Sequence, residues 1–249
     1  MRSIMIGLVL LVGYGSASAA RVELYDRATA QTLPTYSHHG RLYVAGEPGH
    51  EYEIRIHSDS PQRVLAVTTV DGVNVITGQT GAMNQSGYVL DPYGYSGIEG
   101  WRKSMSRTAA FYFTKLPDSY AARTGRPDNV GVIGVAVFRE KTRCCELESG
   151  LRREQDAASA AAPSVQERSD SSWNEKRKSE PKLGTGHGRI ENNAAQYTEF
   201  ERAATTPDET IVIYYDSRRN LVAQGVIPLQ PKYANRWPQP FPNGFVPDP

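Results

Sequence analysis

Charge of one sign, cysteine and long apolar runs are all scarce in this sequence. Its 28 Lys and Arg residues face 27 Asp and Glu residues, so the formal net charge over 249 residues is +1. This balance argues against a protein that binds nucleic acid by bulk positive charge, and equally against a polyacidic tail protein. With only two cysteines, the chain is not a scaffold built on disulfides.

Common catalytic and metal-binding motifs are missing too. The sequence has no G-x-S-x-G, H-E-x-x-H or C-x-x-C spacing. Asp71, Asp91 and Asp118 stand in turn contexts, and nothing selects a carboxylate pair for glycosidase chemistry. The histidines are scattered: His38, His39, His50, His57 and His187. We therefore predict no catalytic residue, no cofactor and no metal site, and we expect the histidines to face solvent.

The first twenty residues have the pattern of a secretory signal peptide. Arg2 gives a positive start, Ile4–Val12 is apolar, and both Ala17-Ser18-Ala19 and Ser18-Ala19-Ala20 fit the small-x-small cleavage rule. The apolar run is shorter than the about 20 helical residues that span a bilayer. We expect residues 1–20 to be removed by cleavage near Ala19 or Ala20, leaving a periplasmic or secreted chain without a membrane span.

From Arg21 to about residue 144 the pattern is that of β-strands. In Glu51–His57, Tyr52 and the two isoleucines alternate with polar side chains, as in a strand with one wet face. Asp71-Gly72 between β-branched runs predicts a hairpin, because both turn positions need positive φ. Further expected strands are Val22–Tyr25, Arg41–Val44, Val64–Val67, Val73–Ile76, Gly87–Leu90, Ser96–Arg102, Ala109–Phe113 and Val132–Phe138. Asp118–Arg123 is expected to form a helical turn with Asp118 as its cap.

These short strands, with turn residues between them, predict an all-β fold. We expect an antiparallel β-sandwich, either Ig-like or jelly-roll-like. Between Cys145 and Lys182 the large apolar residues become too few to offset the entropy of ordering the segment. We therefore expect residues 145–182 to be a disordered or partly helical insertion. Gly184–Gly188 follows this polar stretch rather than a strand, so it predicts a flexible loop and not a phosphate loop.

The β pattern returns after the insertion. Thr210–Tyr215 predicts a strand, Ser217–Asn220 a turn, and Leu221–Ile227 a second strand. Because an isolated hairpin is barely stable, we expect this C-terminal hairpin to complete the sheet, so that residues 21–144 and 183–228 form one β-sandwich domain. Ile211–Tyr215 is apolar or aromatic on both faces and should lie inside the sheet. Residues 229–249 are proline-rich and predict an extended tail.

Cys144 and Cys145 are adjacent. Three states remain open from the sequence: free or variably oxidised thiols, an intermolecular disulfide, and a strained vicinal disulfide. An intermolecular bridge is geometrically easy at the start of the insertion.

Aromatic residues gather between Gly87 and Lys115. Alternate members of a strand face outward, where aromatic rings stack on sugars or anchor a partner. Packing in the core and along cross-strand pairs is the alternative. The candidate binding residues are Tyr93, Tyr95, Trp101 and Tyr112.

Five segments carry a further signal: Gly40–Gly49, Val70–Val75, Gly87–Pro92, Gly100–Arg102 and Gly131–Phe138. Together they resemble a family of uncharacterised exported proteins of Gram-negative bacteria. The resemblance implies export and a common fold, and it transfers no activity or catalytic residue. We expect a non-catalytic interaction or structural module of the envelope, with a protein or envelope component as partner and no nucleic acid. A carbohydrate-binding module that uses exposed aromatics is the alternative, and a hydrolase is the third hypothesis.

Overall fold

Fourteen strands in two sheets make up about half of the described chain. The structure is a computed structural model that describes residues 18–142 and 181–228. Sheet A contains β1 (Ala20–Asp26), β2 (Gln31–Thr32), β5 (Glu51–Ser58), β9 (Tyr95–Ile98), β10 (Gly100–Ser104), β11 (Arg107–Lys115) and β13 (Leu183–Asn192). Sheet B contains β3 (Thr35–His38), β4 (Arg41–Gly46), β6 (Val64–Val70), β7 (Val73–Asn74), β8 (Tyr88–Leu90), β12 (Val132–Arg139) and β14 (Glu209–Ser217).

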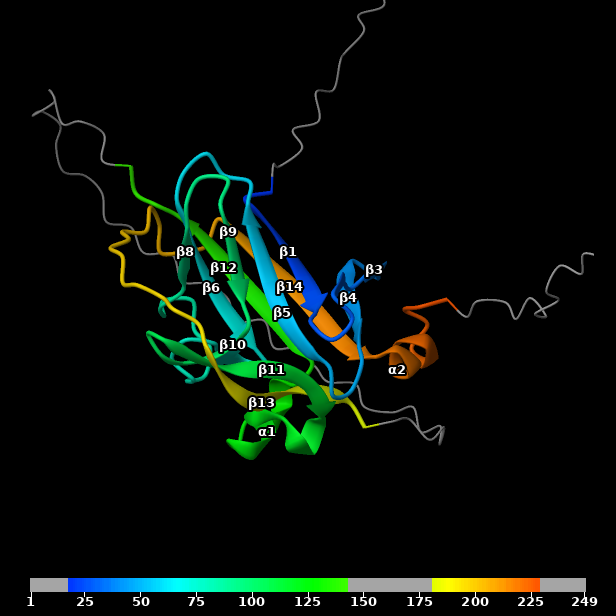
Figure 1. Ribbon diagram of the computed structural model, residues 1–249. Helices are drawn as coiled ribbons and strands as arrows, with labels where there is room; N and C mark the ends of the chain where they lie inside the picture. The colour runs from blue at the N-terminus through cyan, green and yellow to red at the C-terminus, as the bar shows by residue number, and fades with distance from the viewer. Residues whose placement is uncertain (1–17, 143–180, 229–249) are drawn as a thin grey trace, which may run out of the picture.

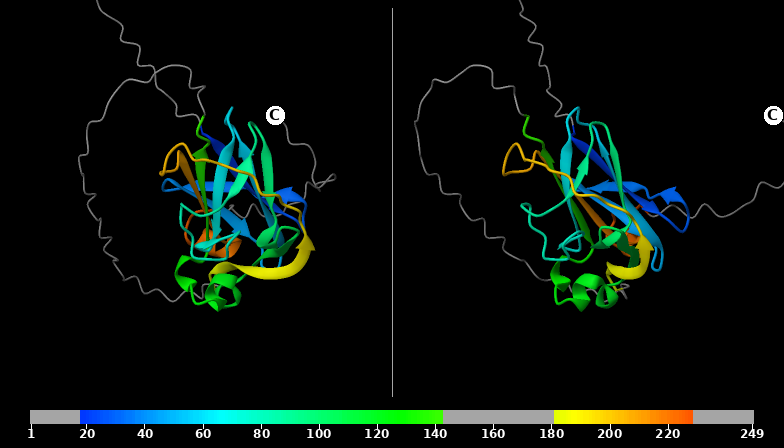
Figure 2. Two further views of the ribbon diagram at one scale, coloured as in Figure 1. Left: turned by 90° about the vertical axis from the view of Figure 1, so that its left-hand side faces the viewer. Right: turned by 60° about the vertical axis from the view of Figure 1, so that its left-hand side comes forward.

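The two sheets pack face to face, so the predicted all-β sandwich is confirmed (Figures 1 and 2). Sheet A has the order β10-β11-β5-β1-β2, with β13 also paired to β11 and β9 to β5. Sheet B has the order β3-β4-β14-β12-β6-β7, with β8 also paired to β6. Every pairing is antiparallel except that of β14 with β4, which is parallel.

The core follows from the period-two pattern of the strands. On β5, Tyr52, Ile54 and Ile56 are fully buried, while Arg55 and His57 on the opposite face stay partly exposed. Burying one such large apolar side chain contributes about 1.5–3 kcal/mol. The inward residues of sheet A meet those of sheet B in one cluster that includes Leu24, Phe111 and Phe113 of sheet A and Val44, Val135, Ile213 and Tyr215 of sheet B.

β14 lies between β4 and β12. The prediction that Ile211–Tyr215 occupies the interior of a sheet is therefore confirmed. Its inward residues Ile213 and Tyr215 are buried, whereas Val212 on the outer face is 36% exposed.

The predicted second strand of the C-terminal hairpin is wrong. Residues 218–223 form helix α2 (Arg218–Ala223) instead. The side chain of Ser217 accepts the N–H of Asn220, which favours a helix start, and Gly225 has a positive φ of 76° just beyond the helix. The apolar residues that suggested a strand are Leu221, Val226 and Ile227. They pack on the outer face of sheet B, against Tyr36, Tyr43 and Ala45.

The prediction of a loop at the glycine-rich run Gly184–Gly188 is wrong, because this run is part of β13. β13 pairs with β11, and two of its backbone N–H groups donate to carboxylates instead of to a strand. Leu183 N–H donates to Asp216 Oδ1 (3.2 Å) and Thr185 N–H donates to Asp71 Oδ2 (2.8 Å). A Cβ on Gly186 would lie 2.2 Å from Cζ of Tyr112. The Tyr112 ring packs directly on the β13 backbone here, so a larger residue in place of Gly186 would displace the ring.

The short helical segments cluster between β11 and β12. They are the 3₁₀ turns η1 (Leu116–Asp118) and η2 (Pro127–Asn129) and the helix α1 (Tyr120–Arg123). The predicted cap was one residue off. Ser119, not Asp118, accepts the N–H of Ala122 (3.2 Å).

Candidate functional site

The register of β1, β5 and β9 gathers polar and aromatic side chains on the outer side of sheet A. Arg21 pairs with His57, Glu23 with Arg55, and Tyr25 with Glu53. β9 then places Tyr95 beside His57 and Gly97 beside Arg55. Side chains two residues apart on a strand share a face. We call the resulting surface the outer face of sheet A; it consists of Arg21, Glu23, Tyr25, Glu53, Arg55, His57 and Tyr95.

Glu53 holds the centre of this face together. Its Oε1 accepts a hydrogen bond from the Tyr95 hydroxyl (2.5 Å), and its Oε2 accepts from Nη2 (3.1 Å) and Nε (3.2 Å) of Arg55. The Arg55 guanidinium also lies 3.4 Å from the ring centroid of Tyr25, in a cation–π contact. A Cβ on Gly97 would lie 2.1 Å from Glu53 Oε1, so a larger residue at this position would displace the carboxylate from the place it holds here.

This arrangement is suited to binding rather than to proton transfer. Burial, together with the hydrogen bond to the Glu53 carboxylate and its charge, raises the pKa of Tyr95 to about 12. The hydroxyl is therefore a neutral donor at physiological pH. The Tyr95 side chain is nevertheless 52% exposed. Its ring packs beside the His57 ring, with 5.0 Å between the two ring centroids. The face thus presents an aromatic ring whose position is fixed by a buried carboxylate.

The four aromatic residues singled out from the sequence do not share one surface. Tyr95 lies on the outer face of sheet A. Tyr93 is 71% exposed in the turn before β9, with a positive φ of 54°. Tyr112 is half-buried on β11, opposite Glu51 of β5. Trp101 must be removed from the set, because β10 turns it into the core: it is 3% exposed and donates Nε1–H to the Gly186 carbonyl (3.1 Å).

Tyr25, Glu53 and Arg55 were missed as candidate site residues. The alternation in Glu51–His57 does place Glu53 and Arg55 on a wet face. The pairing of β5 with β1 and β9, which brings Tyr25 and Tyr95 to them, has no signature in a single sequence.

An ion-pair cluster lies where β1 ends and β5 begins. Arg27 contacts Glu191 (2.8 Å), and Arg189 contacts both Glu51 (2.9 Å) and Glu191 (2.8 Å). The hydrogen bond from Arg27, aided by Arg189, lowers the pKa of Glu191 in spite of its burial. Charges of both signs therefore lie close together on sheet A.

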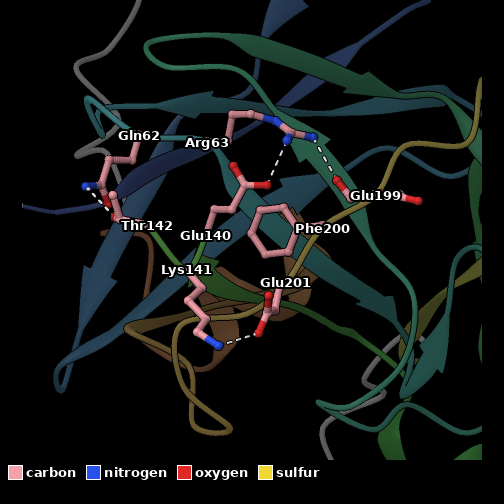
Figure 3. Close-up of a pocket in the computed structure, with 8 residues that line it drawn as sticks. All are labelled: Gln62, Arg63, Glu140, Lys141, Thr142, Glu199, Phe200 and Glu201. Carbon is pink, nitrogen blue, oxygen red and sulfur yellow. Dashed lines mark hydrogen bonds and ion pairs between the residues drawn. The ribbon is translucent and has the colours of Figure 1, made fainter. Parts of the chain in front are cut away.

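A polar cavity of about 630 Å³ lies at the other side of the sandwich, between the end of β12 and residues 199–201 (Figure 3). Its lining consists of Gln62, Arg63, Glu140, Lys141, Thr142, Glu199, Phe200 and Glu201. Glu140 is paired with Arg63 (2.7 Å) and Glu201 with Lys141 (2.6 Å). Figure 3 shows both carboxylates turned toward these bases. Their charges are neutralised locally, so the pair does not resemble the acid and base of a hydrolase.

Asp71 is the most deeply buried carboxylate among the described residues. It lies at the centre of a hydrogen-bond network. Its Oδ1 accepts from Gly131 N–H (2.8 Å) and the Tyr215 hydroxyl (2.6 Å), and its Oδ2 accepts from Thr185 N–H. Burial raises its pKa, although these donors oppose the effect. The Thr185 hydroxyl extends the network to Tyr215 (2.7 Å) and Tyr52 (2.6 Å). This network joins both sheets inside the core, where no substrate has access.

The remaining candidate groups are the histidines and cysteines. Within residues 18–142 and 181–228, no three His, Cys, Asp or Glu side chains come together as metal ligands. His50 Nδ1 instead contacts Asp26 Oδ2 at 2.7 Å. Cys144 and Cys145 lie outside the described residues, so their redox state stays a prediction. None of the helices in the described ranges has the length and apolar character to cross a membrane.

The chain was also compared with known proteins. No family model, curated protein or solved structure matches it.

Proposed function

We propose that this chain is an exported, non-catalytic binding protein of the bacterial envelope, and that it engages a protein partner through the outer face of sheet A. The observation that carries this proposal is the group formed by Tyr95, Glu53, Arg55 and Tyr25. An exposed aromatic ring is fixed there by a 9% exposed carboxylate and an arginine. The signal-like pattern of residues 1–20 supports export.

The composition of this face favours a protein partner. Tyrosine and arginine are enriched among the residues that dominate protein interfaces. Because Glu53 holds both side chains before any partner arrives, little conformational entropy is lost when the complex forms. The sheet B surface offers less, since α2 and Phe200 already cover much of its apolar area.

A carbohydrate ligand is the second candidate. It is favoured by one observation, the exposure of Tyr93 and Tyr95, which are two residues apart and 71% and 52% exposed. However, the Tyr25 ring is covered by Arg55 and Tyr112 lies against Gly186. Each of these two rings therefore has one face already occupied within the protein, which leaves less ring surface for stacking on a sugar.

The test is co-sedimentation of the purified chain with envelope fractions. Tyr95→Ala should weaken binding about 30-fold, the effect of a hot-spot residue worth about 2 kcal/mol. Tyr197→Ala is the matched control, because Tyr197 is 91% exposed and lies outside sheet A. Equal binding by both variants would contradict the proposal. If soluble cell-wall glycans reduced the binding, and protease treatment of the envelope did not, the carbohydrate candidate would be favoured instead.

A further inference from the structure

Glu209, the first residue of β14, binds the start of β1. Its Oε1 accepts a hydrogen bond from the Ser18 hydroxyl (2.7 Å), and its Oε2 accepts the backbone N–H groups of Ala19 (2.6 Å) and Ala20 (3.3 Å). In the described ranges no basic side chain is paired with this carboxylate. A carboxylate that receives three donors from one strand end is suited to a positive charge at that end.

The position of β1 shows where such a charge fits. Ala20 is 2% exposed and pairs with Ser58 of β5, so a cut after Ala20 would remove a buried residue from sheet A. A cut before Ala20 leaves the strand whole and turns the Ala20 nitrogen into a terminal amine. The nearby charges of Arg21 and Asp59 pair with each other at 3.0 Å, which leaves Glu209 as the carboxylate that meets this amine.

We propose that the exported chain is cleaved between Ala19 and Ala20, and that Glu209 binds the new α-ammonium group of Ala20. Water adds across the peptide bond, giving a carboxylate on Ala19 and an amine on Ala20 that takes up a proton. The ammonium supplies three N–H donors where the donors of Ser18 and Ala19 have left. Since Ala20 belongs to sheet A and Glu209 to sheet B, this ion pair links the two sheets at the amino terminus.

This inference rests on the proposed export, and the first measurement separates the two. The protein is purified from the medium or periplasm, and its amino terminus is determined by sequencing and intact mass. We expect Ala20. A start at Ser18 or Arg21 would overturn the inference and leave export standing, whereas a chain that keeps Met1 would overturn both.

The second measurement is the pKa of the Ala20 amine, followed through the ¹³C methyl signal of Ala20 during a pH titration. An opposite charge favours the charged form, so the value should lie at least about 1 above the usual 7.7–8.0. Glu209→Gln should return it to that range, and Asp118→Asn, beside α1 at the opposite end of the sandwich, should not (Figure 1). The urea-unfolded wild-type chain gives a second reference that does not depend on the folding of the variant. An amine with the same pKa in all these states would overturn the proposal.

Discussion

Replacing Asp71 by Asn tests whether the buried network joins the two sheets. Asn has nearly the same volume and tolerates the positive φ of 52° found at this turn position. It offers one acceptor oxygen where Asp offers two. In its better orientation the amide oxygen keeps Gly131 N–H and the Tyr215 hydroxyl, and the NH₂ group then faces Thr185 N–H, donor against donor.

The magnitude follows from that count. A buried N–H group left without an acceptor costs about 1–3 kcal/mol, and the two remaining hydrogen bonds lose their charge assistance. Relief of the carboxylate desolvation, which raises the pKa of Asp71 in the folded chain, offsets part of the loss. We expect the free energy of unfolding to fall by about 2 kcal/mol, and Tm to fall by about 4–8 °C.

The assay is urea denaturation followed by far-UV circular dichroism and tryptophan fluorescence. Asp91→Asn is the matched control, because the Asp91 side chain is 86% exposed, and it should change stability by less than about 0.5 kcal/mol. If Asp71→Asn were as mild as Asp91→Asn, the network would not hold the sheets together and the reasoning would be refuted.

Two further predictions concern packing and pH. Gly186→Ala should lower the free energy of unfolding by about 1–3 kcal/mol, because its Cβ meets the Tyr112 ring. Adding Tyr112→Ala should recover part of that loss. If Gly186→Ala unfolded at the same urea concentration as the wild-type chain, the result would speak against the contact. Burial raises the pKa of Asp26, but the hydrogen bonds from His50 and two backbone amides bring it below its ordinary 3.8. Its stabilisation is present above pH 3.8 and is lost as the pH falls through the lower folded value, so the wild-type advantage over Asp26→Asn should shrink in acid; an advantage that grew in acid would contradict this sign.

Local chemistry was enough to predict much of the fold. The Asp71-Gly72 turn has positive φ at both positions, at 52° and 72°, as in the type I′ turn, whose twist matches that of the flanking strands and which favours Asp-Gly. The alternation in Glu51–His57 and the two-sided apolar character of Ile211–Tyr215 also placed these strands properly. Each of these signals depends on residues that are neighbours in the sequence.

The errors arose where distant residues decide the structure. β13 looks like a loop because glycine disfavours strands, and it becomes a strand because it pairs along its length with β11, while Asp71 and Asp216 accept two further N–H groups of its backbone. Leu221–Ile227 has strand-like residues, but the Ser217 cap and the apolar surface around Tyr43 favour a helix there.

The candidate site was predictable only in part. Tyr95 was identified from the aromatic cluster, whereas Trp101 of the same cluster faces the core, since the direction of each strand face depends on its register. Glu53 was visible as a wet-face residue beside Arg55, but its hydrogen bond from Tyr95 depends on the pairing of β5 with β9.

The measurement that tests the proposed binding face most directly is site-specific photocrosslinking in cells that export the protein. A photoreactive phenylalanine derivative replaces Tyr95 in one chain and Tyr197 in another. We predict a discrete protein adduct from position 95, lost when Arg55→Ala is added, and none from position 197. No adduct from position 95, or the same adducts from both positions, would contradict the account.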